Sequence, residues 1–394
     1  MTTEVSKNIH LITVNDRRKQ LFENMWPIPN GVSYNCYLVV DEKTALLDTV
    51  EFGASTMFEA EVDALLNGKT LDYLIINHME PDHSGEIQNV LARYPDLTVV
   101  GNDKTFKIFE SYYGEVKNKL VVKDGDTLCL GEKNLKFVLT PWVHWPETMM
   151  TYDINSATLF SGDAFGTFGT LDGCYFDDEM DAVAKYEDEM RRYYSNIVGK
   201  YSNMVQKAFA KLEGVEVKAI CALHGPVWRK NPETVLALYD KWSKMEGEDG
   251  VVVAYASMYG ATAYMADYMA RKLAENGVRN IITHDVSKTH ISYLISDMWK
   301  YKAIVLGSCA YNTAMFPTME NLVNKMGHIG LKHRNLGIFG SYSWNGGGVR
   351  NLLTFAESSG WNMVGSVDMA GKPNAEKLAE LDVLAKSIAE SLNQ

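Results

Sequence analysis

Cysteine is scarce and scattered in this sequence of 394 residues. No two of the five cysteines form a Cys-x-x-Cys pair; they are Cys36, Cys129, Cys174, Cys221 and Cys309. This spacing excludes a thiolate-bound zinc ribbon and a rubredoxin-like module. It is typical of reduced thiols, so we expect a cytoplasmic protein.

Other features are also missing. No apolar run is long enough to span a membrane, and the segment Met1–Val5 does not open a signal peptide. Positive charge is in deficit, with 38 Lys and Arg against 50 Asp and Glu, which gives a net charge of -12. Nucleic acid and anionic membrane are therefore not expected as partners.

The length and the change of pattern along the chain indicate two domains, since a single core seldom grows to this size. Residues 244–250 are polar and rich in glycine, as is typical of a linker. We expect one domain at residues 1–243 and a second at residues 251–394.

The two domains follow different patterns. In the first, strand-like runs are clustered and helical stretches lie among them, notably at residues 52–66 and 182–212, which favours sheets covered by helices. In the second, five short apolar strands alternate with helical stretches. These strands are expected at residues 251–255, 281–283, 303–306, 336–339 and 363–365. The alternation predicts a doubly wound parallel sheet with a ligand site at the carboxyl ends of its strands.

Four possible metal ligands follow the apolar run Leu74–Asn77 within six residues: His78, Glu80, Asp82 and His83. We expect them on a loop, because a helix would spread them around its circumference. Two imidazoles and two carboxylates suit iron, zinc or manganese.

Three later residues have a similar context, because His144, Asp163 and His224 each follow a strand-like run. A single histidine after a strand is more often a packed or surface residue than a ligand. Together with the first cluster, however, these residues would bring seven ligands to one edge of a sheet. Four imidazoles and three carboxylates are enough for two metals that share a carboxylate.

Three segments of the second domain are candidates for a flavin site. They are Ser257, Met258, Tyr259, Gly260, Ala261 and Thr262; Ser308, Cys309, Ala310, Tyr311 and Asn312; and Ser341, Tyr342, Ser343, Trp344, Asn345 and Gly346. The first precedes a helix and offers donors for a phosphate, whereas the aromatics of the others could flank a flat ring. Taken alone, each segment could equally be a simple turn or helix cap. No Gly-x-Gly-x-x-Gly fingerprint is present, which makes a dinucleotide less expected.

The metal cluster resembles the His-x-His-x-Asp-His signature of the metallo-β-lactamase fold, with Glu80 in place of a second histidine. Followed by His144, Asp163 and His224, and then by the three loops, it is similar to the flavodiiron proteins. The resemblance implies an α/β and α+β chain: a metallo-β-lactamase-like αββα sandwich followed by a flavodoxin-like domain. It assigns His78, Glu80 and His144 to one iron, Asp82, His83 and His224 to the other, and Asp163 to both.

The resemblance also implies an activity: reduction of dioxygen to water, of nitric oxide to nitrous oxide, or of both. Electrons would reach the two irons through FMN from a separate donor protein such as a rubredoxin. Family members form head-to-tail dimers, so we expect a homodimer or a dimer of dimers.

Two alternatives stay open at this stage. The first is a binuclear zinc hydrolase, acting on a thioester or lactone, fused to a flavodoxin domain. Glu80 argues against it, because a carboxylate in place of an imidazole stabilises the higher oxidation states of iron. The second is an electron-transfer protein whose lactamase-like half is only structural, and the intact ligand set argues against that.

Overall fold

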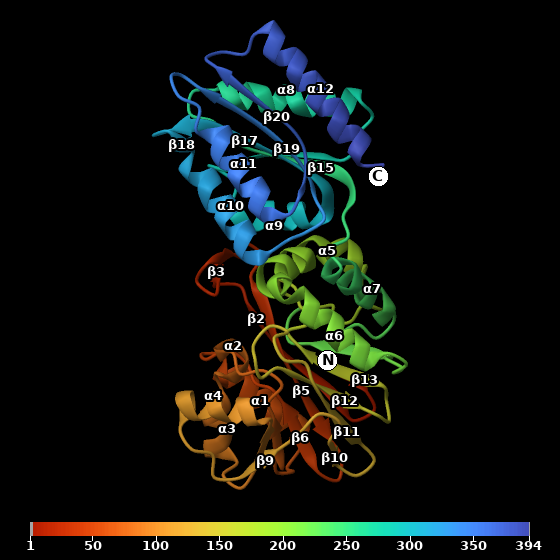
Figure 1. The fold of residues 1–394 in the computed structure, drawn as a ribbon. Helices are drawn as coiled ribbons and strands as arrows, with labels where there is room; N and C mark the ends of the chain where they lie inside the picture. The colour runs from red at the N-terminus through yellow and green to blue at the C-terminus, as the bar shows by residue number, and fades with distance from the viewer. Residues whose placement is uncertain (1–2, 394) are drawn as a thin grey trace. The chain divides into compact units, whose positions relative to one another are not determined.

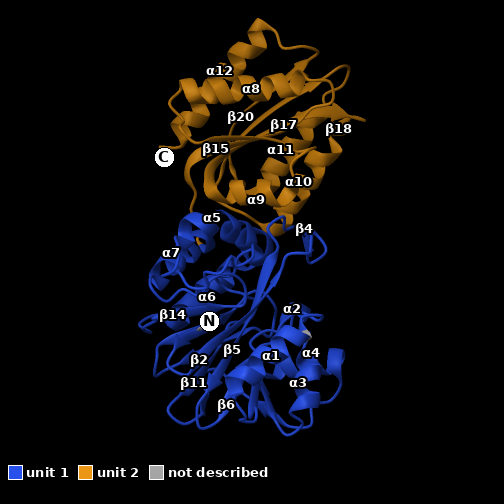
Figure 2. Ribbon diagram, turned by 180° about the vertical axis from the view of Figure 1, so that it is seen from behind, with its two compact units in different colours: residues 1–243 blue, residues 244–394 orange. Residues whose placement is uncertain are grey.

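The computed structural model describes residues 3–393, which divide into two compact units, residues 1–243 and 244–394 (Figure 2). We expected residues 248–250 to be part of the linker, but a strand of the second unit begins at Glu248. Within residues 3–393 no helix is both long and apolar enough to cross a membrane.

Two sheets form the centre of the first unit. Across the larger sheet the order is β1 (Glu4–Ser6), β2 (Ile9–Asp16), β5 (Val32–Val40), β6 (Thr44–Leu47), β7 (Tyr73–Ile75), β8 (Thr98–Gly101) and β9 (Lys119–Val121). Across the smaller sheet it is β10 (Thr127–Cys129), β11 (Asn134–Leu139), β12 (Met149–Asp153), β13 (Thr158–Gly162) and β14 (Ala219–Ala222). A separate hairpin consists of β3 (Leu21–Phe22) and β4 (Trp26–Pro27).

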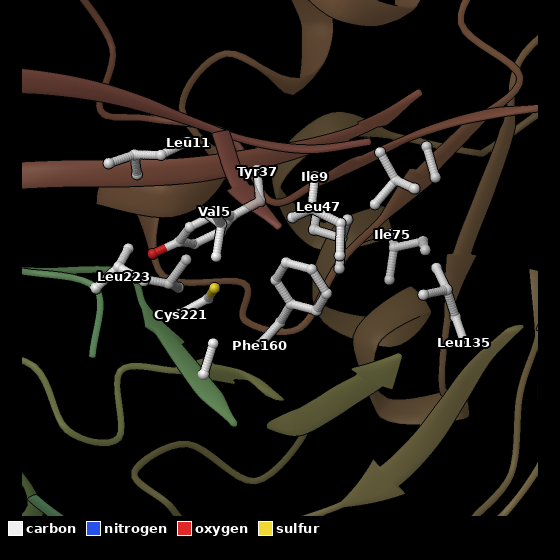
Figure 3. Packing of buried hydrophobic residues seen from close by; sticks show 14 of the residues in the cluster. Val5, Ile9, Leu11, Tyr37, Leu47, Ile75, Leu135, Phe160, Cys221 and Leu223 are labelled. Atoms are coloured by element: carbon white, nitrogen blue, oxygen red, sulfur yellow. The ribbon is translucent and has the colours of Figure 1, made fainter. Parts of the chain in front are cut away.

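The core of the first unit lies between the two sheets. Tyr37, Leu47 and Ile75 of the larger sheet face Phe160 and Cys221 of the smaller one (Figure 3). All five are at most 1% exposed, so these inner faces are dry, and their burial favours stacking of the sheets.

Helices cover the outer faces of this pair of sheets (Figure 1). On one side lie α1 (Ser55–Leu66), α2 (Pro81–Ser84), α3 (Ile87–Arg93) and α4 (Asp103–Tyr113). On the other lie α5 (Ala182–Tyr193), α6 (Ser202–Leu212) and α7 (Pro232–Ser243). The expected helix at residues 182–212 is interrupted by a π-helical turn at Tyr194–Val198 and a short 3-10 turn at Gly199–Tyr201.

The second unit is a parallel sheet between two layers of helices. Its strand order is β16 (Ile281–Asp285), β15 (Glu248–Ala256), β17 (Tyr301–Tyr311), β19 (Asn335–Tyr342) and β20 (Asn362–Ala370), with β18 (Ala314–Met315) attached to β17. One layer contains α8 (Ala261–Glu275) and α12 (Ala375–Ser391); the other contains α9 (Ile291–Lys300), α10 (Pro317–Ile329) and α11 (Gly348–Ser359) (Figure 1). The order second, first, third, fourth, fifth is the flavodoxin-like form of the doubly wound sheet. The predicted fold class is confirmed for both units.

Candidate metal centre and flavin site

Asp48 holds the start of the first ligand segment. One oxygen of its carboxylate accepts hydrogen bonds from the backbone N–H of Asn77 (2.8 Å) and of His78 (3.1 Å). The other accepts one from the side-chain amide of Asn77 at 2.9 Å. Burial raises the pKa of Asp48 to about 6, although these bonds favour its charged form. This network fixes the chain where β7 ends and the ligands begin.

The second half of the ligand segment is helical, so the expectation of a loop is wrong for Asp82 and His83. Both lie in the one-turn helix α2, whose first residue is Pro81 and whose N-cap is Glu80. Proline is favoured at this position because its fixed φ suits a helix start. A helix of four residues is too short to spread its side chains, and Asp82 and His83 lie in the same ligand group.

The structure brings all seven candidate ligands together in two buried groups. In each group the ligand atoms lie within 4.8 Å of one another. The groups are His78, Glu80, His144 and Asp163, and Asp82, His83 and His224. Since these residues come from four distant parts of the chain, the folding of the first unit alone creates the cluster.

Asp163 directs one carboxylate oxygen toward each group. Its Oδ2 lies 3.0 Å from His144 Nε2 and 3.4 Å from His78 Nε2. Its Oδ1 lies 2.9 Å from His83 Nε2 and 3.7 Å from His224 Nε2. A carboxylate in this position can bridge two cations.

Buried ligand atoms without a suitable partner show that the cluster fits metal ions. The Nε2 atoms of His83 and His224 face each other at 3.0 Å. Both carboxylate oxygens of Asp82 are buried and accept no hydrogen bond from any residue in the range 3–393. A buried carboxylate without a partner is costly, and a bound cation removes that cost.

The pKa values of the histidines reflect the same excess of negative charge. Burial acts to lower the pKa of His83, but the carboxylates of Asp82 and Asp163 outweigh it and raise the value to about 9. The pKa of His144 is also raised to about 9, because hydrogen bonds to Asp163 and Glu80 outweigh burial. The carboxylates therefore stabilise positive charge among themselves, as a binuclear metal site requires.

Aromatic side chains surround the second ligand group. The ring of His224 lies 5.4 Å from Phe22, 5.6 Å from Tyr34 and 5.5 Å from Tyr193, centroid to centroid. Trp145 packs at 5.4 Å against His78, the ligand of the other group. No pattern in the sequence predicted the contacts of Phe22, Tyr34 and Tyr193 with His224.

Two of the ring nitrogens that point away from the centre, those of His78 and His224, have their own partners. His78 Nδ1 lies 2.8 Å from Glu147 Oε1, and His224 Nδ1 lies 2.8 Å from the carbonyl oxygen of Ser33. These bonds leave each Nε2 free to bind a metal. Sequence reasoning missed Glu147, although it follows His144 by only three residues.

The three flavin candidates meet at one edge of the second unit. In the parallel sheet Ala256 of β15 pairs with Ser308 of β17, which pairs with Gly340 of β19. The segments after these positions therefore leave the sheet side by side. This edge is the one where doubly wound sheets bind ligands.

The bounds of these segments differ from those expected. Residues 308–311 continue β17 and are not a loop, because Ala310 and Tyr311 pair with β18. Ser341 and Tyr342 likewise end β19, and Ala261 and Thr262 begin α8. The other candidates lie in the connections: Ser257, Met258, Tyr259, Gly260, Asn312, Ser343, Trp344, Asn345 and Gly346.

The first segment is suited to an anion. Ser257 Oγ accepts a hydrogen bond from the N–H of Gly260 at 3.1 Å, and Gly260 has a φ of 94° that favours glycine. The chain then enters α8, whose first N–H groups have no acceptor within the helix. Thr262 Oγ1 lies 2.9 Å from Ser341 Oγ, and this buried contact joins the first segment to the third.

Two aromatic candidates of the flavin segments are largely exposed. Tyr259 is 93% exposed and Trp344 is 84% exposed. Large exposed aromatics are free to contact a flat ligand or another protein surface. Their exposure is compatible with the predicted flavin site.

Comparison with known proteins shows similarity over almost the whole chain. The rubredoxin oxygen:oxidoreductase of Desulfovibrio gigas has a TM-score of 0.95 and 27% identity, with 100% of this chain and 99% of that chain covered. A variant of the flavo di-iron protein of Thermotoga maritima has a TM-score of 0.91 and 26% identity, with 99% and 98% covered.

A third similarity, to the anaerobic nitric oxide reductase flavorubredoxin of Escherichia coli O1:K1, is closer in sequence. The two are 33% identical over 384 residues, which cover 96% of this chain and 80% of that protein. The chain belongs to the flavodiiron protein family. The family model described as "ODP family beta lactamase" matches residues 32–225 of this flavodiiron protein, a range that contains all seven candidate ligands.

Proposed function

We propose that this protein is a flavodiiron oxidoreductase that reduces dioxygen to water, nitric oxide to nitrous oxide, or both. The observation that carries the proposal is the position of Asp163, whose two carboxylate oxygens face two separate ligand groups. Relatives named as a nitric oxide reductase and as an oxygen oxidoreductase support the choice of reaction.

We assign the iron pair to residues 1–243 and FMN to residues 251–394. His78, Glu80 and His144 would hold one iron, Asp82, His83 and His224 the other, with Asp163 shared. Two ferrous ions and reduced FMN together supply four electrons, the number that reduction of dioxygen to water consumes.

The seven ligand side chains are buried in the first unit. Every one of the seven ligands is at most 8% exposed. The rings of Phe22, Tyr34 and Tyr193 exclude water from the side of His224, and Trp145 does so beside His78. Exclusion of water strengthens the electrostatic contacts of the site and limits side reactions.

Glu80 favours redox iron over the zinc hydrolase alternative. Its carboxylate lies 3.0 Å from His144 Nε2 and 3.2 Å from His78 Nε2, and these contacts hold its pKa below the usual range although burial opposes this. A third anionic ligand beside the two aspartates suits a metal that passes between ferrous and ferric. Zinc has no such transition.

FMN is supported by the edge at which β15, β17 and β19 end. Ser257, Gly260 and the start of α8 would bind its phosphate. Tyr311 and Trp344, both exposed, would flank its ring. An external protein would deliver electrons to it, and the Desulfovibrio gigas relative is named for a rubredoxin.

We further propose a cytoplasmic head-to-tail homodimer. All five cysteines are free, which suits a reducing compartment. Apolar side chains are exposed at both sites: Leu21 and Met25 on the hairpin next to His224, and Tyr259 and Trp344 on the flavin segments. A second copy that covers both sites would bury them. Sedimentation that gives a monomer at micromolar concentration would contradict the dimer.

The decisive experiment mixes the fully reduced protein with dioxygen and, separately, with nitric oxide in a stopped-flow instrument. We expect rapid oxidation by at least one gas in protein that contains two irons and one FMN per chain. Metal analysis of anaerobically purified protein provides the control. Two zinc ions with little iron, and no reaction with either gas, would favour the hydrolase.

A further inference from the structure

The two ligand groups offer the same kinds of ligand. Each has two imidazoles and one carboxylate of its own, and both share Asp163. Direct ligands therefore give no reason for two irons at this site to differ. Any difference must come from the groups that contact the ligands.

The outward ring nitrogens do differ in their partners. His78 Nδ1 faces the carboxylate of Glu147 at 2.8 Å, whereas His224 Nδ1 faces only the backbone carbonyl of Ser33. His83 Nδ1 is buried and has no hydrogen-bond partner among residues 3–393. Only the first group is thus linked to an additional negative charge through a ligand.

Glu147 is an unusual carboxylate. Its side chain is fully buried, and Oε1 also accepts a hydrogen bond from the N–H of Met79 at 2.9 Å. Its Oε2 is buried without a hydrogen-bond partner in the part of the chain that the structure describes. Asn102 donates to the backbone carbonyl of Glu147 at 2.6 Å and so fixes its position. Within residues 3–393 the ion pair found for this carboxylate is the one with His78, and both side chains are 0% exposed.

A carboxylate that accepts the Nδ1 proton has two effects on a metal-binding imidazole. It fixes the tautomer in which Nε2 binds the metal, and it makes the ring a stronger electron donor. It also brings the carboxylates around the cluster to four, which matches the charge of two ferrous ions. The stronger electron donation and the added negative charge both stabilise the higher oxidation state of the nearer metal.

We propose that Glu147 is a positioning residue that acts through His78 and makes the iron held by His78, Glu80 and His144 the first of the two to be oxidised. This inference rests on the proposed diiron function. It assigns unequal roles to two positions with equal ligand sets.

The test compares Glu147→Gln with the wild type by redox titration followed by EPR. Glutamine keeps the size and one acceptor oxygen but removes the charge. We expect the lower of the two diiron potentials to shift upward, the potential range of the mixed-valent signal to narrow, and iron affinity to fall by roughly 10–100-fold.

Glu23→Gln is the matched control, since the charge of Glu23 also acts on Glu80 and Asp82 but no ligand imidazole bonds to it. Glu23 instead accepts a hydrogen bond from the indole N–H of Trp26 at 2.8 Å, so its removal leaves the partners of every ligand imidazole in place and should shift the potentials much less. Equal shifts in both variants, or none in Glu147→Gln, would overturn the proposal.

A second measurement does not depend on the variant. In zinc-loaded wild-type protein, NMR should show the Nδ1 proton of His78 farther downfield than that of His224, because a carboxylate accepts more strongly than a carbonyl. Equal chemical shifts of the two Nδ1 protons would refute the hydrogen bond from His78 to Glu147. Failure of the wild type to take up iron would instead refute the proposed function and would leave this NMR comparison valid.

Discussion

The two candidate sites of this protein are built in opposite ways. The metal centre consists of charged side chains inside the first unit, where Asp163 and His224 are completely buried. The flavin site consists of turns and strand ends at the surface of the second unit, where Tyr259 and Trp344 stand in solvent. A buried charge requires a partner, whereas an exposed aromatic does not. The unpaired buried atoms of the first site therefore indicate that it binds metal. The evidence for the flavin site is mainly the order of the strands that end there.

Asp163→Asn should have the largest effect, because it should eliminate the metal centre and spare the flavin site. An amide cannot bridge two cations as a carboxylate does, so we expect loss of both irons and of gas reduction. FMN content should stay at the wild-type level. Iron and flavin analysis checks this, with Asp172→Asn, an exposed aspartate of the same unit, as the control. Retention of both irons would contradict the bridging role.

Gly347→Ala should impair the flavin site and spare the metal centre. A Cβ at Gly347 would lie 2.2 Å from the carbonyl oxygen of Thr313, which is backbone and cannot easily move. Displacement of the third flavin segment at a cost of about 1–3 kcal/mol should weaken FMN binding about 10–100-fold and leave iron unchanged. Gly327→Ala is the control, because a Cβ there meets nothing within 4 Å. Fluorescence titration of FMN into flavin-free protein measures the difference.

Thr262→Val tests whether the contact between Thr262 and Ser341 joins the first and third flavin segments. Loss of the buried contact with Ser341 should weaken FMN binding by about 1 kcal/mol, or roughly fivefold. Ser341→Ala should have a similar effect, and the double variant should be little worse than either single one. Fully additive losses would show that the two hydroxyls act independently.

Trp344→Ala should have the smallest effect on stability. The side chain is 84% exposed, so its loss should change the free energy of unfolding by less than about 0.5 kcal/mol. If the ring contacts FMN, affinity should nevertheless fall. Thermal unfolding of flavin-free protein and FMN titration of the same samples separate the two effects. A large drop in the unfolding temperature would mean that the ring supports the fold.

Sequence reasoning was most successful where function follows from strand order. The second unit could be predicted because its strands alternate with helices, and a ligand after a strand, such as His144, tends to lie at a sheet edge. It was less successful where local geometry decides. Pro81 starts a helix in the ligand segment, and pairing with β18 extends β17 through Tyr311.

Glu147 and Tyr193 could not be found from the sequence, because only packing places them beside the ligands. Tyr193 lies at the end of α5, where no sequence pattern separates it from an ordinary core residue. A buried carboxylate such as Glu147 also has no sequence signature. Its significance depends on a distance to His78 across 69 positions of the chain.

The spread of the ligands along the chain has a consequence for how the protein matures. His78 and His224 are separated by 146 positions, and the strands between them must pair before the two imidazoles can approach each other. The order of assembly is thus constrained: the first unit must fold before it can capture a second metal ion. When iron is in excess, iron content per chain then measures the fraction of molecules in which the first unit has folded correctly.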